Sequence, residues 1–329
     1  MQHERELAVE GKRERVGAPV SFEGAMEYLL IQVLNGVQLG LLMFLLAAGL
    51  TLTFGIMDLV NLAHGSLYMI GAYLAWTFIA WTDSFLLGAL LALPATFIVG
   101  VILEVVVVRR LYGRDHLDQV LATFGLILFF NDLVRMVWGP AGKSIAVPAF
   151  LSHTVQILPG VSYPAYRFAL IVVGLLVALL LAWLVARTRL GMLIRAGASN
   201  RRMIAALGVN IELLFSLVFG LGAVFAGLAG LMTAPISSVK IGMGDDILIL
   251  AFVIIVIGGI GSIKGAFVAA MVVGQIDIFG RAFLPELLKS FLSPASASAA
   301  APAISQVLIY VLMAGVLVWR PTGLFGQRP

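Results

Sequence analysis

The sequence predicts an all-α protein that crosses a membrane about eight to ten times. Apolar residues make up 61% of its 329 residues and charged residues only 12%, whereas a soluble domain is about half apolar and a quarter charged. Apolar runs such as 85–108 and 168–186 are long enough for a helix to cross a hydrocarbon core of ~30 Å. The alternating segments of a membrane β-barrel are not seen in the sequence, so we expect helical spans.

Uninterrupted and interrupted spans can be placed along the chain. Uninterrupted spans are expected at 26–46, 65–82, 85–108, 119–137, 166–186, 213–233 and 304–319. The stretches 47–64 and 245–282 are also apolar, but polar residues or glycines interrupt them. Interrupted helices in both halves of a chain are typical of transporters built from an internal repeat. The two stretches are only weakly similar, so the sequence leaves open whether a repeat exists.

Composition divides the chain into a polar extension at 1–25, one membrane domain at 26–320 and a short tail at 321–329. The extension is charged and lacks the apolar core of a cleavable signal peptide, so we expect the first span to act as the insertion signal. The chain has no cysteine, which excludes disulfides and thiolate metal ligands.

The distribution of Lys and Arg predicts the orientation, because loops rich in these residues stay in the cytoplasm. Arginines follow the spans that end near residues 108, 186 and 319, so these loops and both termini are expected in the cytoplasm. The 138–165 segment has Lys143 as its single basic residue and is expected outside, as is a proline-containing loop at 280–303. The basic residues of the cytoplasmic loops therefore account for the net charge of +4, and nucleic-acid binding is not needed to explain it.

The first interruption, GIMDLVNLAHGS at 55–66, places polar side chains between two apolar runs. An ionisable or amide side chain costs several kcal/mol in contact with lipid, so these residues must face protein, water or an interface. The candidate pathway or gate residues here are Asp58, Asn61, His64, Gly65 and Ser66. Alternatively, Asn61 and His64 only cap the helix segments, with Gly65 supplying conformational freedom and Ser66 an N-terminal cap.

The second interruption is rich in glycine. Gly258, Gly259 and Gly261 allow either a sharp reversal of the chain or very close helix contact, and we count them as further candidate pathway residues. Lys264 follows them and is expected to extend its amine to the cytoplasmic surface.

Two other patterns concern packing and charge pairing. Gly222, Ala226 and Gly230 are spaced four apart, which places small residues along one helix face and favours close packing inside the chain. Asp132 and Arg135 are expected to form an ion pair one turn apart, beside Asn131 near the external end of their span.

The segment RTRLGMLIRAGASNRRMIAALGVN at 187–210 contains five arginines and no acidic residue. Its sequence is compatible with a helix from Met192 to Leu207 that stops at Gly208. A loop that only orients the protein needs fewer arginines and no helix. We therefore expect an exposed basic helix that docks on a cytoplasmic partner.

Over about residues 26–326 the chain resembles the integral permease subunits of the branched-chain amino acid class of ATP-binding cassette importers. The segments that carry the resemblance are GLTLTFGIMDLVNLAHGSLYMIGAYLA at 49–75, RTRLGMLIRAGASNRRMIAALGVN at 187–210, AFVIIVIGGIGSIKGAFVAA at 251–270 and RPTGLFG at 320–326. Asn61, His64 and Gly65 match the Asn-x-x-His-Gly element of this family.

The resemblance implies a polytopic permease of the bacterial inner membrane that works by alternating access. It implies a second, similar permease subunit, two ATPase subunits that bind ATP and Mg, and a periplasmic solute-binding protein; this chain would hold no cofactor or metal and have no catalytic site. The 187–210 segment would be the coupling helix, with Arg195, Ala198, Arg201, Arg202, Ala205 and Gly208 as contact residues.

The cargo is not fixed by the sequence. The resemblance implies a small polar solute, either a branched-chain or other amino acid or else urea, a short amide or a small carboxylate. A secondary transporter or channel that works without ATPases is the alternative, but such proteins usually bury ionisable relays at the centres of their spans, and most spans here have none.

Overall fold

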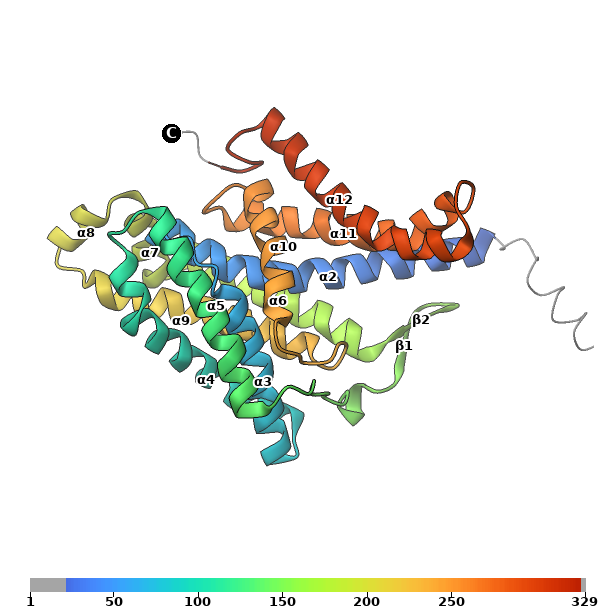
Figure 1. The fold of residues 1–329 in the computed structure, drawn as a ribbon, viewed down its shortest axis with the longest axis horizontal. Helices are drawn as coiled ribbons and strands as arrows, with labels where there is room; N and C mark the ends of the chain where they lie inside the picture. Colours follow the sequence, from blue (N-terminus) through green and yellow to red (C-terminus); the bar gives the residue numbers. More distant parts are fainter. Residues whose placement is uncertain (1–21, 327–329) are drawn as a thin grey trace, which may run out of the picture.

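The computed structural model describes residues 22–326, and α-helices form most of it (Figure 1). The long helices are α2 (Phe22–Met57), α3 (His64–Thr82), α4 (Phe85–Val106), α5 (His116–Trp138), α6 (Ala165–Arg187), α9 (Ile211–Thr233), α10 (Met243–Gly258), α11 (Ile263–Leu288) and α12 (Pro294–Trp319). Shorter elements are the helices α7 (Arg189–Ser199) and α8 (Arg201–Ala206) and the 3₁₀ turns η1 (Val108–Leu111) and η2 (Ala149–Leu151). Strands β1 (Thr154–Leu158) and β2 (Val161–Pro164) form an antiparallel hairpin.

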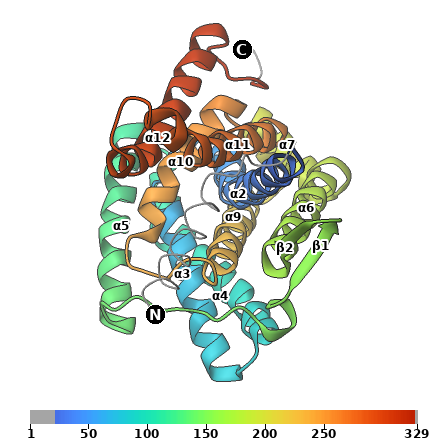
Figure 2. The same ribbon diagram turned by 90° about the vertical axis from the view of Figure 1, so that its right-hand side faces the viewer.

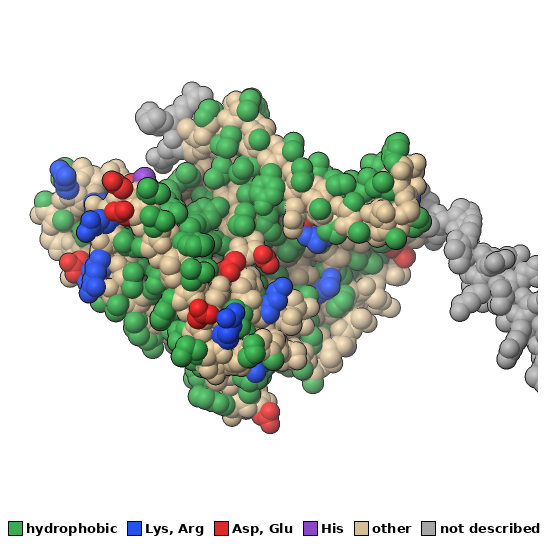
Figure 3. Space-filling model, in the orientation of Figure 1, with side chains coloured by type: hydrophobic (Ala, Val, Ile, Leu, Met, Phe, Trp, Pro, Cys, Tyr) green, Lys and Arg blue, Asp and Glu red, His purple; other side chains and the backbone are tan. Residues whose placement is uncertain are grey.

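The all-α membrane architecture predicted from composition is confirmed. Seven helices of the described part are long and apolar enough to cross a membrane, namely α2, α4, α5, α6, α9, α11 and α12. Helices α4, α5, α6 and α12 bury at most about a quarter of their apolar windows, so their remaining apolar surface is suited to lipid. Figure 3 shows this broad hydrophobic surface, with basic side chains gathered at the left, where α8 lies.

Helix α2 lies inside the bundle. It packs against α6, α9, α10 and α11, and Figure 2, which looks roughly along its axis, shows these helices around it. Its 36 residues correspond to about 54 Å of helix, well beyond the ~30 Å of a hydrocarbon core. A single unbroken helix therefore runs through the interior of the bundle.

Close contacts between small residues hold α9 against its neighbours. A Cβ placed on Gly222 would lie 3.1 Å from the carbonyl oxygen of Gly49, and one placed on Gly230 would collide with the carbonyl of Tyr68. Ala226, between them on the same face, is fully buried. The predicted small-residue face is confirmed, and it packs within the chain, against α2 and α3.

Two ends of the bundle can be distinguished. The hairpin end contains β1 and β2, an isolated bridge between Lys143 and Val239, and the predicted Asp132–Arg135 ion pair, which is confirmed at 3.2 Å. The arginine end contains η1, α7, α8 and residues 320–326.

The start of α2 lies at the hairpin end, because the Asn35 side chain accepts hydrogen bonds from Tyr163 and Arg167 (2.9 and 3.0 Å). The sequence placed the start of the first span on the side of the arginine-rich loops and 138–165 on the opposite side. That expectation is wrong, because residues 47–57 continue the first helix and do not begin a separate crossing. The extension at 1–21 and residues 327–329 lie outside the described part of the chain.

The expected external loop at 280–303 is also mostly helical. Helix α11 continues to Leu288 and α12 begins at Pro294, so only 289–293 connects them. Proline is compatible with the first turn of a helix, Ser293 caps α12 by accepting from the Ser296 amide, and alanine is the best helix former. The alanine-rich run is thus the start of a helix, which Pro302 interrupts only locally.

Candidate functional site

The first break separates α2 from α3 and lies at the arginine end. Asp58 adopts a left-handed conformation (φ 52°) and is exposed. Helix α5 holds the following turn, because Gln119 accepts a hydrogen bond from the Val60 amide at 3.1 Å. Asp58 therefore ends α2 at the surface, and the chain turns inward after it.

Asn61, His64 and Ser66 are buried. The side-chain polar atoms of Asn61 and Ser66 have no hydrogen-bond partner in the described structure, whereas the His64 imidazole lies beside the backbone of Leu46 without a hydrogen bond of good geometry. The N-cap of α3 is Ala63 and no side chain caps this helix, so the capping role considered for Ser66 is wrong. The side chains of Asn61 and His64 also make no capping hydrogen bond. These buried groups are candidates for the pathway.

Three helices converge on His64. A Cβ added to Gly49 of α2 would lie 2.8 Å from His64 Nε2, so the imidazole occupies the space that this glycine leaves open. Gly222 of α9 packs on the same turn of α2. On the next residue, Gly65 is helical and contacts Gly244 of α10 so closely that neither can carry a side chain. Gly65 thus serves close packing, and the conformational freedom expected for it is not used.

The second break, between α10 and α11, uses its glycines for both expected purposes. Gly259 and Gly261 have positive φ angles of 98° and 80°, which glycine adopts without strain, and Gly258 packs directly on Gly265. The C-terminal segment closes this break, because the Leu324 and Phe325 amides donate to the carbonyls of 257 and 258 at 2.9 and 3.0 Å. Sequence reasoning missed this role, although the last carbonyls of a helix always need donors.

The two breaks lie close together. A Cβ on Gly55, near the end of α2, would be 3.1 Å from the Cα of Gly261. A cleft of about 80 Å³ lies here, lined also by Ile194, Arg195 and Ala198 of α7. The structure therefore joins both interruptions to the arginine-rich segment.

The arginine-rich segment is two helices where one was expected from 192 to 207. Asn200 separates α7 from α8 with an extended backbone, and its side chain accepts a hydrogen bond from the Met203 amide at 3.0 Å. Asparagine competes with helix continuation in this way and is a strong N-cap. Gly208 has a φ of 86°, which confirms it as the stop.

Helix α8 exposes an apolar surface that sequence reasoning missed. Met203 is 59% exposed and Leu207 76% exposed, beside Arg202, Ala205 and Gly208, which are also exposed. Apolar side chains exposed at the basic end of a membrane protein are typical of a docking site for another protein. Arg195 and Ala198 lie on α7, separate from this surface.

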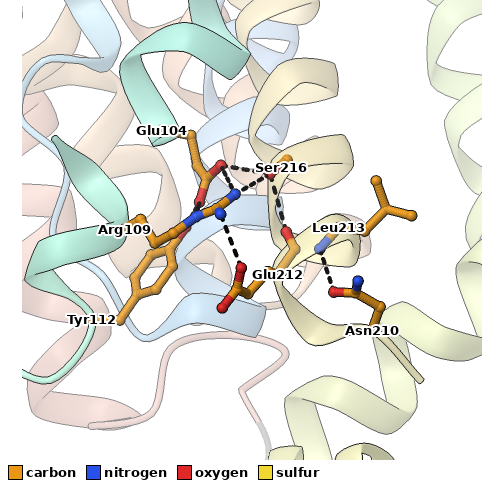
Figure 4. A network of polar contacts seen from close by, with 7 residues as sticks. All are labelled: Glu104, Arg109, Tyr112, Asn210, Glu212, Leu213 and Ser216. Atoms are coloured by element: carbon orange, nitrogen blue, oxygen red, sulfur yellow. Dashed lines mark hydrogen bonds and ion pairs between the residues drawn. The ribbon is translucent and has the colours of Figure 1, made fainter. Parts of the chain in front are cut away.

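A buried polar network lies beside α8 (Figure 4). Glu104, 0% exposed near the end of α4, accepts hydrogen bonds from Arg109, Tyr112 and Ser216 at 2.6–3.1 Å. Arg109 also pairs with Glu212 at 3.0 Å. The bond to Glu104 raises the pKa of Arg109, whereas burial and then the bond to Glu104 raise the pKa of Tyr112. The network joins α4 and η1 to the start of α9.

Helix α8 contacts this network through aromatic rings. The guanidinium of Arg201 lies 5.6 Å from the ring centroid of Phe215, and the Phe215 ring meets the Tyr112 ring edge-on at 5.1 Å. Asn210 caps the start of α9 by accepting from the Leu213 amide. Contacts therefore run from α8 through Phe215 to α9, which packs against α2, α3 and α4.

These features define a multi-pass helical membrane protein with two neighbouring helix breaks, buried polar groups at one of them, and an exposed arginine-rich segment at one end. Residues 32–317 match the family model described as branched-chain amino acid transport system / permease component. The chain belongs to this family, and the resemblance drawn from its sequence is confirmed.

Known members of the family are similar over nearly their whole length. The high-affinity branched-chain amino acid transport system permease protein BraD of Pseudomonas aeruginosa is 31% identical, with 91% of this chain and 96% of BraD aligned. The corresponding permease protein LivH of Salmonella typhimurium is 27% identical over the same shares. A probable branched-chain amino acid transport permease protein of Methanocaldococcus jannaschii is 26% identical, with 87% and 89% aligned. No solved structure matches the chain.

Proposed function

We propose that this chain is the permease subunit of an ATP-binding cassette importer that moves a small polar solute of the branched-chain amino acid class across the bacterial inner membrane by alternating access. The observation that carries the proposal is a pair of buried polar groups at the first break: the Asn61 amide, which has no hydrogen-bond partner in the described structure, and the His64 imidazole, which lies against Gly49 of α2. Family membership and the names of the relatives support the solute class.

The unpartnered atoms point to a second conformation. A polar group buried without a hydrogen bond costs about 1–3 kcal/mol, and this conformation contains several such groups around the first break. A conformation that admits water or solute there would regain those hydrogen bonds. An amide and an imidazole together offer donors and acceptors, which suits an amino acid with its ammonium and carboxylate.

Energy would enter at α8. We propose that Arg202, Met203, Ala205, Leu207 and Gly208 contact an ATPase subunit, which binds ATP and Mg, whereas this chain itself binds no nucleotide. Moving a two-state equilibrium from 1:99 to 99:1 takes about 5.5 kcal/mol, which nucleotide binding by two partners can supply. The Arg201–Phe215 contact and the Glu104 network would carry the movement into α9 and α4.

The remaining partners follow from this arrangement. The arginine end would face the cytoplasm, which places the start of α2 and the hairpin outside, where a periplasmic solute-binding protein would dock. A second, similar permease subunit would complete the membrane part. The C-terminal segment 320–326 would lie on the cytoplasmic side.

The test replaces the buried polar side chains of Asn61 and His64 with leucine. His64→Leu and Asn61→Leu should raise the melting temperature of the purified complex, because apolar groups cost nothing where polar groups lacked partners. The same variants should reduce ATP-dependent uptake of radiolabelled leucine into proteoliposomes at least about tenfold, which is roughly 1.4 kcal/mol of lost function.

The matched control is Tyr73→Phe, which removes another buried hydroxyl without a partner, also on α3. It should leave uptake unchanged. Full uptake by His64→Leu and Asn61→Leu would contradict a role for the first break in transport, and uptake driven by an ion gradient without ATPase subunits would favour a secondary transporter.

A further inference from the structure

A long groove lies on the outside of the bundle between α6 and α11. Its volume is about 770 Å³, and its walls are apolar along α6, from Leu175 through Leu179 and Ala182, and along α11, at Phe267 and Val268. Phe44 of α2 also lines it, and Figure 2 shows α6 and α11 on two sides of α2. The groove is separate from the buried polar break and from the exposed surface of α8.

One end of the groove carries two positive charges. Arg195 of α7 and Lys264 of α11 both line it, and none of its lining residues is acidic. Neither cation has an ion pair within the described residues. Both side chains are exposed, so the charge is available to a ligand.

The dimensions match one leaflet of a bilayer. The α6 part of the lining extends from Leu175 to Ala186, which is about 16 Å along a helix and close to half of a ~30 Å hydrocarbon core. The cations lie at the arginine end, where α6 leaves the membrane and α11 begins. Charge is therefore at the depth of headgroups, and the apolar walls are at the depth of acyl chains.

We propose that this groove binds an anionic phospholipid of the cytoplasmic leaflet, with its phosphate between Arg195 and Lys264 and one acyl chain along α6 and α11. Basic pockets between membrane helices on the cytoplasmic side are suited to anionic headgroups. A polar solute does not fit walls of this kind, and a second protein subunit packed here would have to place acidic residues of its own opposite both cations, because a buried charge without a partner is costly.

The test is native mass spectrometry of the purified complex with phosphatidylglycerol and phosphatidylethanolamine of identical acyl chains. The complex should retain phosphatidylglycerol preferentially. Each of Lys264→Gln and Arg195→Gln should weaken its binding about fivefold, because a basic residue at the membrane surface contributes on the order of 1 kcal/mol, and the double variant should weaken it further. Ala182→Phe, which fills the apolar part, should weaken binding of both lipids.

Arg110→Gln is the matched control, because Arg110 is exposed at the same end of the bundle and does not line the groove; it should bind phosphatidylglycerol as the parent does. Equal retention of the two lipids, or unchanged binding in the double variant, would overturn the proposal. So would a crosslink to the other permease subunit from a photoreactive maleimide attached to the Ala182→Cys variant, since a protein would then cover the groove.

Discussion

Glu104 is a fully buried carboxylate in an otherwise apolar run, and its stability depends on its partners. Arg109 binds it through two nitrogens, and Tyr112 and Ser216 each donate a hydroxyl. Removing one partner of a buried ion pair leaves an uncompensated charge in a low-dielectric site. The network therefore keeps the ends of α4 and α9 together at the point where α8 approaches them.

Glu104→Ala is expected to destabilise the protein by about 1–3 kcal/mol, because it removes the buried acceptor of Tyr112 and Ser216, whereas Arg109, which is 30% exposed, keeps its ion pair with Glu212. Glu104→Gln should cost less, since it keeps an acceptor for Tyr112. The melting temperature of the purified complex, followed by tryptophan fluorescence, measures both effects. Glu212→Gln is the control: Glu212 is 70% exposed, so its variant should stay within about 1 kcal/mol of the parent, and an equal loss in both positions would contradict the role of burial.

Adding one methyl group at Gly65 tests how closely α3 and α10 pack. A Cβ there collides with the carbonyl of Gly244, so Gly65→Ala should force α3 away from α10 and cost about 1–3 kcal/mol. Gly125→Ala on α5 is its counterpart, because nothing lies within 4 Å of a Cβ at that glycine. The Gly125 variant should be neutral or more stable by up to about 1 kcal/mol. Equal melting temperatures of the two variants would show that α3 and α10 separate easily.

Which residues could be predicted from the sequence depended on how far away their partners lie. Asn61 and His64 were evident because they interrupt an apolar run, and Gly208 because glycine commonly ends helices. Glu104 was passed over inside its run: Arg109 and Tyr112 are only five and eight positions away, but its partner Ser216 is 112 positions away and only the fold brings it to this site. The exposure of Met203 and Leu207 could not be predicted, because a helical sequence pattern does not show which apolar side chains the rest of the protein leaves exposed.

At the scale of elements, helix boundaries were the weakest part of the sequence-based prediction. Hydropathy marked the first span as 26–46, but polar or small residues inside a buried helix do not end it, and α2 continues to Met57. At 280–303, prolines suggested a loop, yet Pro285 and Pro302 lie inside helices. The helical type of the membrane spans was predictable, whereas the β1–β2 hairpin, the division between α7 and α8 and the exact ends of the helices were not, because they depend on tertiary packing.

The division between α7 and α8 leads to a prediction about Asn200. Asn200→Ala removes the cap of α8, worth about 1 kcal/mol, and favours one continuous helix through position 200. That would reorient Arg201 and the exposed Met203 and Leu207, so transported leucine per ATP hydrolysed should fall while the melting temperature changes little. Asn200→Asp keeps the cap and should behave as the parent. If Asn200→Ala couples normally, the break between the helices has no part in energy transfer.

The whole molecule is a rod-centred bundle with two different ends. Helix α2 forms the interior, lipid-suited helices surround it, and both helix breaks lie near the arginine end with the arginine-rich segment. The sequence left open whether 47–64 crosses the membrane, and one crossing more or less reverses the side on which the first span begins. The contacts of Asn35 with Tyr163 and Arg167 show that α2 begins at the hairpin end of the bundle.

The account depends on one claim, that a movement of α8 opens the buried first break to water. Ala63 is fully buried beside Asn61 and His64, and the chain has no cysteine, so Ala63→Cys provides the single reporter thiol of this chain, and the importer without the substitution gives the background labelling. Labelling of this position by a membrane-impermeant maleimide in the assembled importer is the most direct measurement. We predict slow labelling at rest, much faster labelling during ATP hydrolysis, and no such increase when Asn200→Ala is added. A cysteine that stays protected in every nucleotide state while leucine is still transported would contradict the account.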